Sequence, residues 1–321
     1  MFIMANENNP EKSLGFWQRV GLEVLWGISR GMHFMPRWFR YYIFKPFIYG
    51  LLLLTRYRLK IVRRNLELCF PERSPKERKR MARQYYKSLA EIIVDTISLA
   101  GATPKCDSKR VTWANGEEHL KRVEGKDWIA ICAHFGCWEY YLQLSWFDKG
   151  SRLIGVYHPL RSPLFECYYL RLRNISERLD LVTMQDTIRF YMRNRGKGTN
   201  YTMGLISDQS PRLSVDTEWY DFFGQPTAFI EGGATMAKKF HMPIYFVNVR
   251  RRRAGEYEYR FDELYDGVED IDTHEITQRY ATTLEAMIRQ TPELWLWSHH
   301  RWRYTPEKQE KLRESIKNRQ N

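Results

Sequence analysis

The chain has few cysteines, and they are not spaced to bind zinc. Its five thiols form no CxxC pair and no Cys/His cluster with zinc-ligand spacing. The five are Cys69, Cys106, Cys132, Cys137 and Cys167. We interpret them as reduced, partly buried side chains of a protein in a cytosolic compartment. We therefore expect neither a structural zinc site nor a disulfide framework.

Long uninterrupted apolar runs are also lacking. A membrane-spanning helix needs about 20 apolar residues in a row, but charged residues interrupt the stretch 14–36, and the stretch 41–54 contains Lys45 and Pro46. Residues 1–11 carry acidic residues where a secretory signal has a basic segment. We therefore expect no signal peptide, and a single spanning N-terminal anchor is the minority alternative to attachment at the membrane surface.

Signatures of nucleic-acid binding are missing too, since the sequence contains no helix-turn-helix, zinc-finger or RNP-like pattern. Positive charge is in excess. Lysine and arginine number 51 against 38 aspartates and glutamates, a formal net charge of +13 over 321 residues. A basic surface of this kind favours an anionic partner. Composition alone leaves nucleic acid, an acidic lipid surface and a phosphorylated small molecule open.

Aromatic residues gather near the N-terminus, between residues 34 and 49, among Arg37, Arg40 and Lys45. They are Phe34, Trp38, Phe39, Tyr41, Tyr42, Phe44, Phe47 and Tyr49. Rings and basic side chains together suit the headgroup zone of a bilayer. The segment 1–80 holds 16 basic against 6 acidic residues, which would attract an anionic leaflet. We favour interfacial membrane attachment; an aromatic-rich helical subdomain packed on the main fold is the alternative.

From about residue 128 short β-type runs alternate with helical stretches. This alternation predicts an α/β fold with a mainly parallel central sheet and helices on both faces. Strands are expected at 128–133, 153–157, 181–184, 201–207, 243–249 and, as an alternating edge-like strand, 257–264. Helices are expected at 74–100, 136–146, 163–179, 187–194, 229–241 and 273–290, with a surface helix after 305. We divide the chain into a helical membrane-associating segment, 1–60, and an α/β domain, 61–321.

His134 and Glu139 form the strongest local signal, because they follow the apolar run WIAICA. A histidine there lies at the carboxyl end of a strand, where α/β active sites form. The two residues would not share a helix face, so they can meet only if His134 lies in the turn ahead of the helix. An imidazole–carboxylate pair of this kind suits a general base. Taken alone, the HxxxxE spacing is a weak signal.

Further blocks carry a resemblance to a known family. With HxxxxE, the stretches RYRLKIVRRNLELCFPERSPKER, VYHPLRSPLF, SDQSP, FFGQPTAFIEGGATMAKKFHMPIYFVNVRR and PELWLWSHHRWR follow one another along the chain. In this order the sequence resembles the late acyltransferases of lipid A biosynthesis, from about Leu14 to Tyr304. The HxxxxE element is also similar to that of the wider glycerolipid acyltransferases, which commonly carry aspartate as the acid.

The resemblance implies a fatty acyl transfer from acyl carrier protein to a hydroxyl of a lipid A precursor at the cytoplasmic face of the inner membrane. It implies His134 as general base and Glu139 as the partner that orients it. It also implies an arginine in the helix after the second strand, Arg171 or Arg173, and we prefer Arg171 as an oxyanion or phosphate ligand. No cofactor beyond the acyl donor is expected. Where many relatives have arginine before proline, this chain has His158, which puts an anion-binding role there in doubt.

Several residues admit two interpretations. Asp208 in SDQSP follows an expected strand and could hold the site loop or cap the next turn. The run 250–253 is either a solvated strand end or a contact for carrier protein or lipid phosphate. The segment 299–301, with its two histidines and one arginine, is interpreted as structural or acceptor-facing. For the whole protein, the alternatives are acylation of another membrane lipid, such as a glycerolipid, ornithine lipid or phosphoinositol mannoside, and a non-catalytic basic membrane-binding protein.

Overall fold

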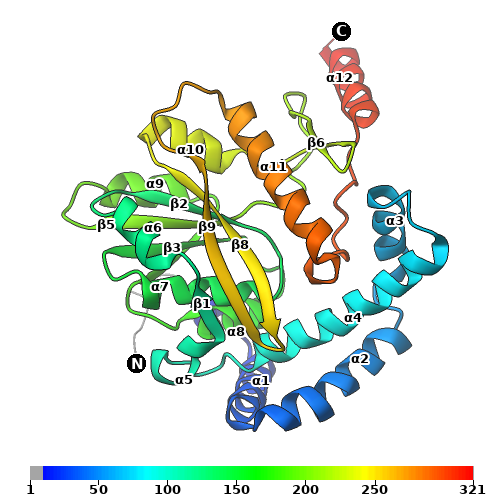
Figure 1. Cartoon of the computed structure of the whole chain (residues 1–321), viewed down its shortest axis with the longest axis vertical. Helices are drawn as coiled ribbons and strands as arrows, with labels where there is room; N and C mark the ends of the chain where they lie inside the picture. Colours follow the sequence, from blue (N-terminus) through cyan, green and yellow to red (C-terminus); the bar gives the residue numbers. More distant parts are fainter. Residues whose placement is uncertain (1–9, 321) are drawn as a thin grey trace.

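A seven-stranded sheet forms the centre of the computed structural model, which describes residues 10–320 (Figure 1). The strand order is β1-β9-β8-β2-β5-β3-β4. All neighbours pair in parallel except β8 and β9, which are antiparallel. The α/β fold class with a mainly parallel sheet is therefore confirmed. The expectation of no signal peptide rests on residues 1–11, most of which lie outside the described residues.

All six expected strands are present, and three short ones were not predicted. The sheet strands are β1 (Val111–Trp113), β2 (Trp128–Cys132), β3 (Ser151–Tyr157), β4 (Leu179–Thr183), β5 (Asn200–Ile206), β8 (Ile244–Arg253) and β9 (Glu256–Tyr265). A separate hairpin consists of β6 (Tyr220–Phe222) and β7 (Gln225–Thr227). The expectation that 257–264 is an edge strand was wrong, because the three-residue β1 pairs with the outer side of β9.

Helices follow the strands and cover the sheet. They are α6 (Gly116–Arg122), α7 (Leu144–Phe147), α8 (Pro163–Arg173), α9 (Thr187–Asn194), α10 (Gly232–Phe240) and α11 (Thr273–Gln290). Helices α10 and α11 pack against β8, while α7 contacts β3 and α9 contacts β4. A Cβ atom on Gly233 would lie 3.1 Å from Leu205 Cδ1, so this glycine lets α10 approach the sheet closely. The predicted helix 136–146 is instead a 3₁₀ turn, η4 (Trp138–Gln143), followed by the short α7.

The first part of the chain is helical, as expected. It contains α1 (Phe16–Phe34), the π-helical turn η2 (Phe39–Phe44), α2 (Lys45–Leu54), α3 (Leu59–Cys69) and α4 (Pro75–Ile97). In Figure 1, α1 and α2 lie at the lower edge of the molecule, with α4 directly above α2. A capping box starts α4: Ser74 Oγ accepts a hydrogen bond from the Glu77 amide, and the Glu77 carboxylate accepts one from the Ser74 amide. The division at residue 60 stays a prediction, since α3 runs across it.

Large apolar side chains are exposed on α1, η2 and α2. Among the most exposed are Phe16, Trp17, Phe34, Tyr42, Phe47 and Leu54, and the exposed fraction of Leu54 reaches 82%. Within residues 10–320, no helix has both the length and the apolar content to cross a membrane. The remaining elements are η1 (Pro10–Ser13), α5 (Pro104–Asp107), η3 (Ser108–Arg110), η5 (Pro292–Leu294) and the surface helix α12 (Pro306–Gln320).

Candidate active site

Strands β2 and β5 bring His134 and Asp208 together. The strands are parallel neighbours, and their last residues, Cys132 and Ile206, are paired in register. His134 and Asp208 each lie two residues beyond this pair, so both emerge at the same carboxyl edge of the sheet. The register therefore explains how residues 74 positions apart come into contact.

The imidazole of His134 lies 2.7 Å from the Asp208 carboxylate, from Nδ1 to Oδ1. A carboxylate accepts hydrogen bonds, so Nδ1 carries the proton and Nε2 presents a lone pair. The side-chain amide nitrogen of Gln209 lies 3.2 Å from Nε2 and donates to it. The His134 side chain is 19% exposed, whereas that of Asp208 is 3% exposed. The ring therefore reaches the surface, and the buried Asp208 carboxylate fixes its orientation through Nδ1.

Asp208 is held as an anion inside the protein. Its second oxygen accepts a hydrogen bond of 2.8 Å from the Trp295 indole. Burial alone would raise the pKa of Asp208, but the His134 imidazole and the Trp295 donor outweigh it and lower this pKa. A buried carboxylate with a lowered pKa fixes the tautomer of the neighbouring imidazole and stabilises the imidazolium that forms when the ring takes a proton.

A tight turn fixes the backbone around His134. Gly136 has a positive φ of +58°, and a Cβ atom there would lie 2.6 Å from Cε1 of Tyr257, so only glycine suits this position. The Gly136 amide donates to the Leu294 carbonyl at 2.9 Å, and the Leu296 amide donates to the His134 carbonyl at 3.1 Å. These bonds tie the histidine turn to the segment after η5 and keep the ring from moving away from Asp208.

Glu139 does not pair with His134 among the contacts of the described residues. It lies in η4 and forms a two-pronged ion pair with Arg173, both contacts being 2.8 Å. Because the chain forms a 3₁₀ turn after Trp138, the Glu139 side chain turns toward the last residue of α8. Both groups are largely buried, and the Glu139 carboxylate raises the pKa of Arg173 although burial opposes it. The expectation that Glu139 orients the imidazole is therefore corrected: Asp208 holds that position.

Arg171, the preferred arginine, lies away from this cluster. It contacts Glu11 at 2.6 Å and Glu23 at 2.7 Å, and so fixes η1 and α1 to α8. Residues two apart on a helix point about 200° away from each other, so Arg173 faces Glu139 when Arg171 faces α1. The structure therefore brings Arg173, and not Arg171, to the HxxxxE turn.

His158 follows β3 at the same edge of the sheet, but its contact is local. The ring is exposed, and Nδ1 lies 2.9 Å from the carbonyl oxygen of the next residue, Pro159. Within residues 10–320, His158 forms no hydrogen bond with His134 or Asp208.

The C-terminal block supports the loop that carries Asp208. His299 Nε2 accepts a hydrogen bond of 3.2 Å from the Ser210 amide, and burial lowers the pKa of His299 to about 4. The Arg301 guanidinium is buried, donates to the Ala228 carbonyl at 2.6 Å, and has its pKa lowered by burial to about 10. These contacts support the structural role, one of the two expected for the segment 299–301. Within the described chain, no group of three metal-binding side chains is present.

Two residues of the cluster were not predicted individually. Trp295 lies inside the block PELWLWSHHRWR, but the sequence does not indicate which indole of this block contacts Asp208. Gln209 lies inside SDQSP and was overlooked beside Asp208. The cysteines flanking His134 are buried, and burial raises the pKa of the Cys132 and Cys137 thiols well above the ordinary range. This arrangement suits a histidine base and gives no thiolate nucleophile.

The sequence is similar to one family of known proteins. The family described as bacterial lipid A biosynthesis acyltransferase matches residues 14–304. A lipid A biosynthesis lauroyltransferase of Escherichia coli (strain K12) is 28% identical over 256 residues, which cover 78% of this chain and 80% of that protein. A lipid A biosynthesis acyltransferase of Haemophilus influenzae is 23% identical over 255 residues, covering 78% and 79%. A palmitoleoyltransferase of the same Escherichia coli strain is 31% identical over 107 residues, or 32% and 31% of the two chains.

Proposed function

The chain belongs to the bacterial lipid A biosynthesis acyltransferase family, and we propose that it transfers a fatty acyl chain from acyl carrier protein to a hydroxyl of a lipid A precursor. The family match supports the reaction class. The hydrogen bond between His134 and Asp208 at the carboxyl edge of the sheet is the observation that carries the proposed chemistry.

In the proposed step, His134 Nε2 takes the proton of the acceptor hydroxyl while that oxygen attacks the carbonyl carbon of the donor thioester. The carbon–sulfur bond then breaks, the electron pair stays on sulfur, and the imidazolium returns its proton to the departing thiolate. An ester and a free carrier thiol result, so atoms and charge balance. Asp208 stabilises the transient imidazolium across 2.7 Å. The thioester supplies the driving force, and the proposal needs no further cofactor.

Glu139 and Arg173 have a positioning role in this proposal. Their buried ion pair fixes the turn after His134 against the end of α8. The Arg173 guanidinium gives two of its donors to Glu139, and its centre lies 5.1 Å from the Tyr169 ring, so its orientation is fixed on both sides. We expect this pair to set the shape of the histidine turn and His134 to perform the proton transfer.

We place the protein at the cytoplasmic face of the inner membrane, where an amphipathic acceptor would be found. The exposed rings and aliphatic side chains of α1, η2 and α2 support an interfacial attachment, since such side chains enter the headgroup zone. The positive net charge favours an anionic membrane surface, a phosphorylated acceptor and an acidic carrier protein alike.

The test is mass spectrometry of a tetra-acylated lipid A precursor incubated with the protein in detergent and acyl carrier protein charged with several saturated chains. The expected result is a mass gain of one acyl chain. The matched control is an acceptor whose acyl chains lack the 3-hydroxyl, which should gain nothing. Thioester loss without a gain on the acceptor would move the acceptor to another lipid. If neither substrate changes while the protein is folded, the proposed function is wrong.

A further inference from the structure

Most of the net positive charge of the protein comes from one short part of the chain. Residues 56–87 contain twelve lysines and arginines against three glutamates, a surplus of nine in a chain whose total is +13. This part consists of the end of the loop after α2, all of α3, and the N-terminal half of α4. The charge is therefore concentrated on one helical hairpin and is not spread over the surface.

The free cations of this hairpin lie along one stripe of each helix. On α3 they occur at spacings of three and four residues, and on α4 at spacings of three, four, seven and eleven, which place them on one face. We call them the hairpin basic face: Lys60, Arg63, Arg64, Lys76, Lys79, Arg80, Arg83 and Lys87. All eight are exposed, and none forms an ion pair with another residue of the described range 10–320. Their charge is therefore available to a partner.

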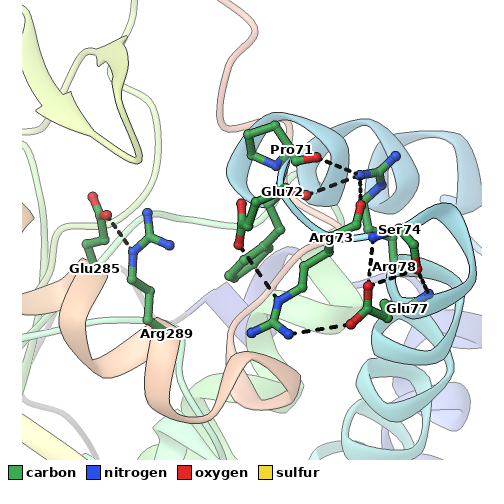
Figure 2. A network of polar contacts seen from close by, with 9 residues as sticks. Pro71, Glu72, Arg73, Ser74, Glu77, Arg78, Glu285 and Arg289 are labelled. Atoms are coloured by element: carbon green, nitrogen blue, oxygen red, sulfur yellow. Dashed lines mark hydrogen bonds and ion pairs between the residues drawn. The ribbon is translucent and has the colours of Figure 1, made fainter.

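A network of polar contacts holds the turn that joins the two helices (Figure 2). Ser74 and Glu77 cap α4, and the Arg78 guanidinium donates to the carbonyls of Phe70, Pro71 and Arg73. Arg289 of α11 lies over the Phe70 ring, which fixes the hairpin to the α/β domain. The basic side chains thus project from a preorganised support.

The hairpin is also bonded to the segment that supports Asp208. Asn65 of α3 donates to the carbonyls of Trp297 and His299, both at 2.8 Å. His299 in turn accepts from the amide of Ser210, two residues after Asp208. His299 therefore links α3 to the loop at the carboxyl edge of the sheet at which His134 emerges.

The hairpin basic face differs chemically from the membrane-facing part of the protein. The exposed large apolar side chains near the N-terminus extend only as far as Tyr57, and none occurs in the described range 58–159. Surfaces that enter a bilayer carry rings and aliphatic side chains with their cations. A rigid, charged and apolar-free face instead fits an acidic protein, which it recognises by charge complementarity.

We propose that the hairpin basic face is the docking surface for the acidic carrier protein that delivers the acyl chain. This proposal rests on the proposed function, because it takes the acyl donor to be carried by such a protein. Docking there would bring the thioester on its flexible prosthetic arm to the edge where His134 lies, while α1 and α2 contact the membrane.

The test reverses two charges, K79E with R83E, which lie one turn apart on the exposed face of α4. The matched control is R189E with R193E, an exposed i,i+4 pair on α9 that makes the same change in net charge. The dissociation constant for acyl carrier protein is measured by titration calorimetry, which needs no turnover. KM is measured for the acyl carrier protein donor and for the same acyl group on coenzyme A. Binding to vesicles containing anionic lipid is measured in parallel.

The α4 variant should weaken carrier binding and raise KM for the carrier donor by about tenfold or more. The coenzyme A donor, vesicle binding and the α9 control should change little. Equal weakening in both variants would overturn the proposal, because a general charge effect would explain it. Normal carrier binding with lost vesicle binding would also overturn it and assign the face to the membrane. If the wild type binds the carrier protein but acylates no precursor, the proposed function fails and the docking surface stands.

Discussion

Replacing Asp208 by asparagine is expected to put the proton of His134 on the wrong nitrogen. The Trp295 indole can only donate, and it lies 2.8 Å from the second oxygen of Asp208. The single oxygen of asparagine would therefore turn toward Trp295, and the amide NH₂ would face His134 Nδ1. That nitrogen must then accept, so the proton moves to Nε2, the nitrogen that must take the proton of the acceptor hydroxyl.

The size of the effect follows from what the correct tautomer would cost in this variant. If Nδ1 stays protonated, the asparagine amide has two orientations, and each places two buried donors face to face. Its NH₂ group points either at the protonated Nδ1 of His134 or at the indole NH of Trp295. Each unsatisfied group costs about 1–3 kcal/mol, so the pair costs about 2–6 kcal/mol. At about 1.4 kcal/mol per factor of ten, we expect kcat to fall by about 30-fold to about 10⁴-fold. The assay is the initial rate of acyl transfer at saturating donor and acceptor.

A second substitution tests the same reasoning in the opposite direction. Changing Trp295 to phenylalanine in the D208N background removes the competing donor while keeping a ring in the core. The amide oxygen can then turn to His134, and kcat should rise at least tenfold above that of D208N alone. Circular dichroism and urea unfolding control for folding. A D208N enzyme within tenfold of wild type, or a double variant no faster than the single one, would refute the tautomer argument.

Three further predictions concern buried charge and backbone. R173M leaves the Glu139 carboxylate buried and unpaired, and should lower the free energy of unfolding in urea by about 3–5 kcal/mol. Adding E139Q should restore most of this stability. A double variant no more stable than R173M would show that the loss does not come from the unpaired carboxylate. The pKa of Asp95 is raised by burial to about 7, so the folded state keeps a proton that the unfolded state loses near 3.8. Stability should therefore fall by about 3 kcal/mol from pH 4 to 7. D95N should flatten this slope in urea titrations at several pH values, and an unchanged slope would contradict it. G136A should lower the free energy of unfolding by at least about 2 kcal/mol, and with it the melting temperature, because of the positive φ of Gly136 and the close Tyr257 ring. An unchanged melting temperature would show that the turn relaxes.

Regular elements could be predicted from the sequence because local signals determine them. Pro75 after the Ser74 cap starts α4, and the Asp272 cap starts α11 at the predicted residue. The strand β1 has only three residues, which is too short for a periodic pattern to be recognised. The turn after His134 could not be predicted as 3₁₀, because long-range bonds to the segment after η5 override the local helical preference.

The sequence predicted most residues of the candidate site, but not which of them are in contact. His134 and Asp208 were both expected at strand ends, but the strand order was unknown, and only the pairing of β2 with β5 shows that they meet. Glu139 was expected beside His134 because it is near in sequence, but it forms an ion pair with Arg173 of α8 instead. Sequence separation gave no measure of distance here, since a partner 74 residues away lies closer than one five residues away.

His134 performs the proton transfer in the proposed reaction. The decisive measurement therefore compares the acyl-transfer rates of wild type, H134A and H274A with acyl carrier protein and the lipid A precursor. His274 is the control because its side chain is 45% exposed and pairs with Glu218 on the surface. We predict that H134A transfers no measurable acyl chain while keeping its fold and its binding to vesicles, and that H274A retains the wild-type rate. A folded H134A protein that acylates the precursor at the wild-type rate would contradict the central claim.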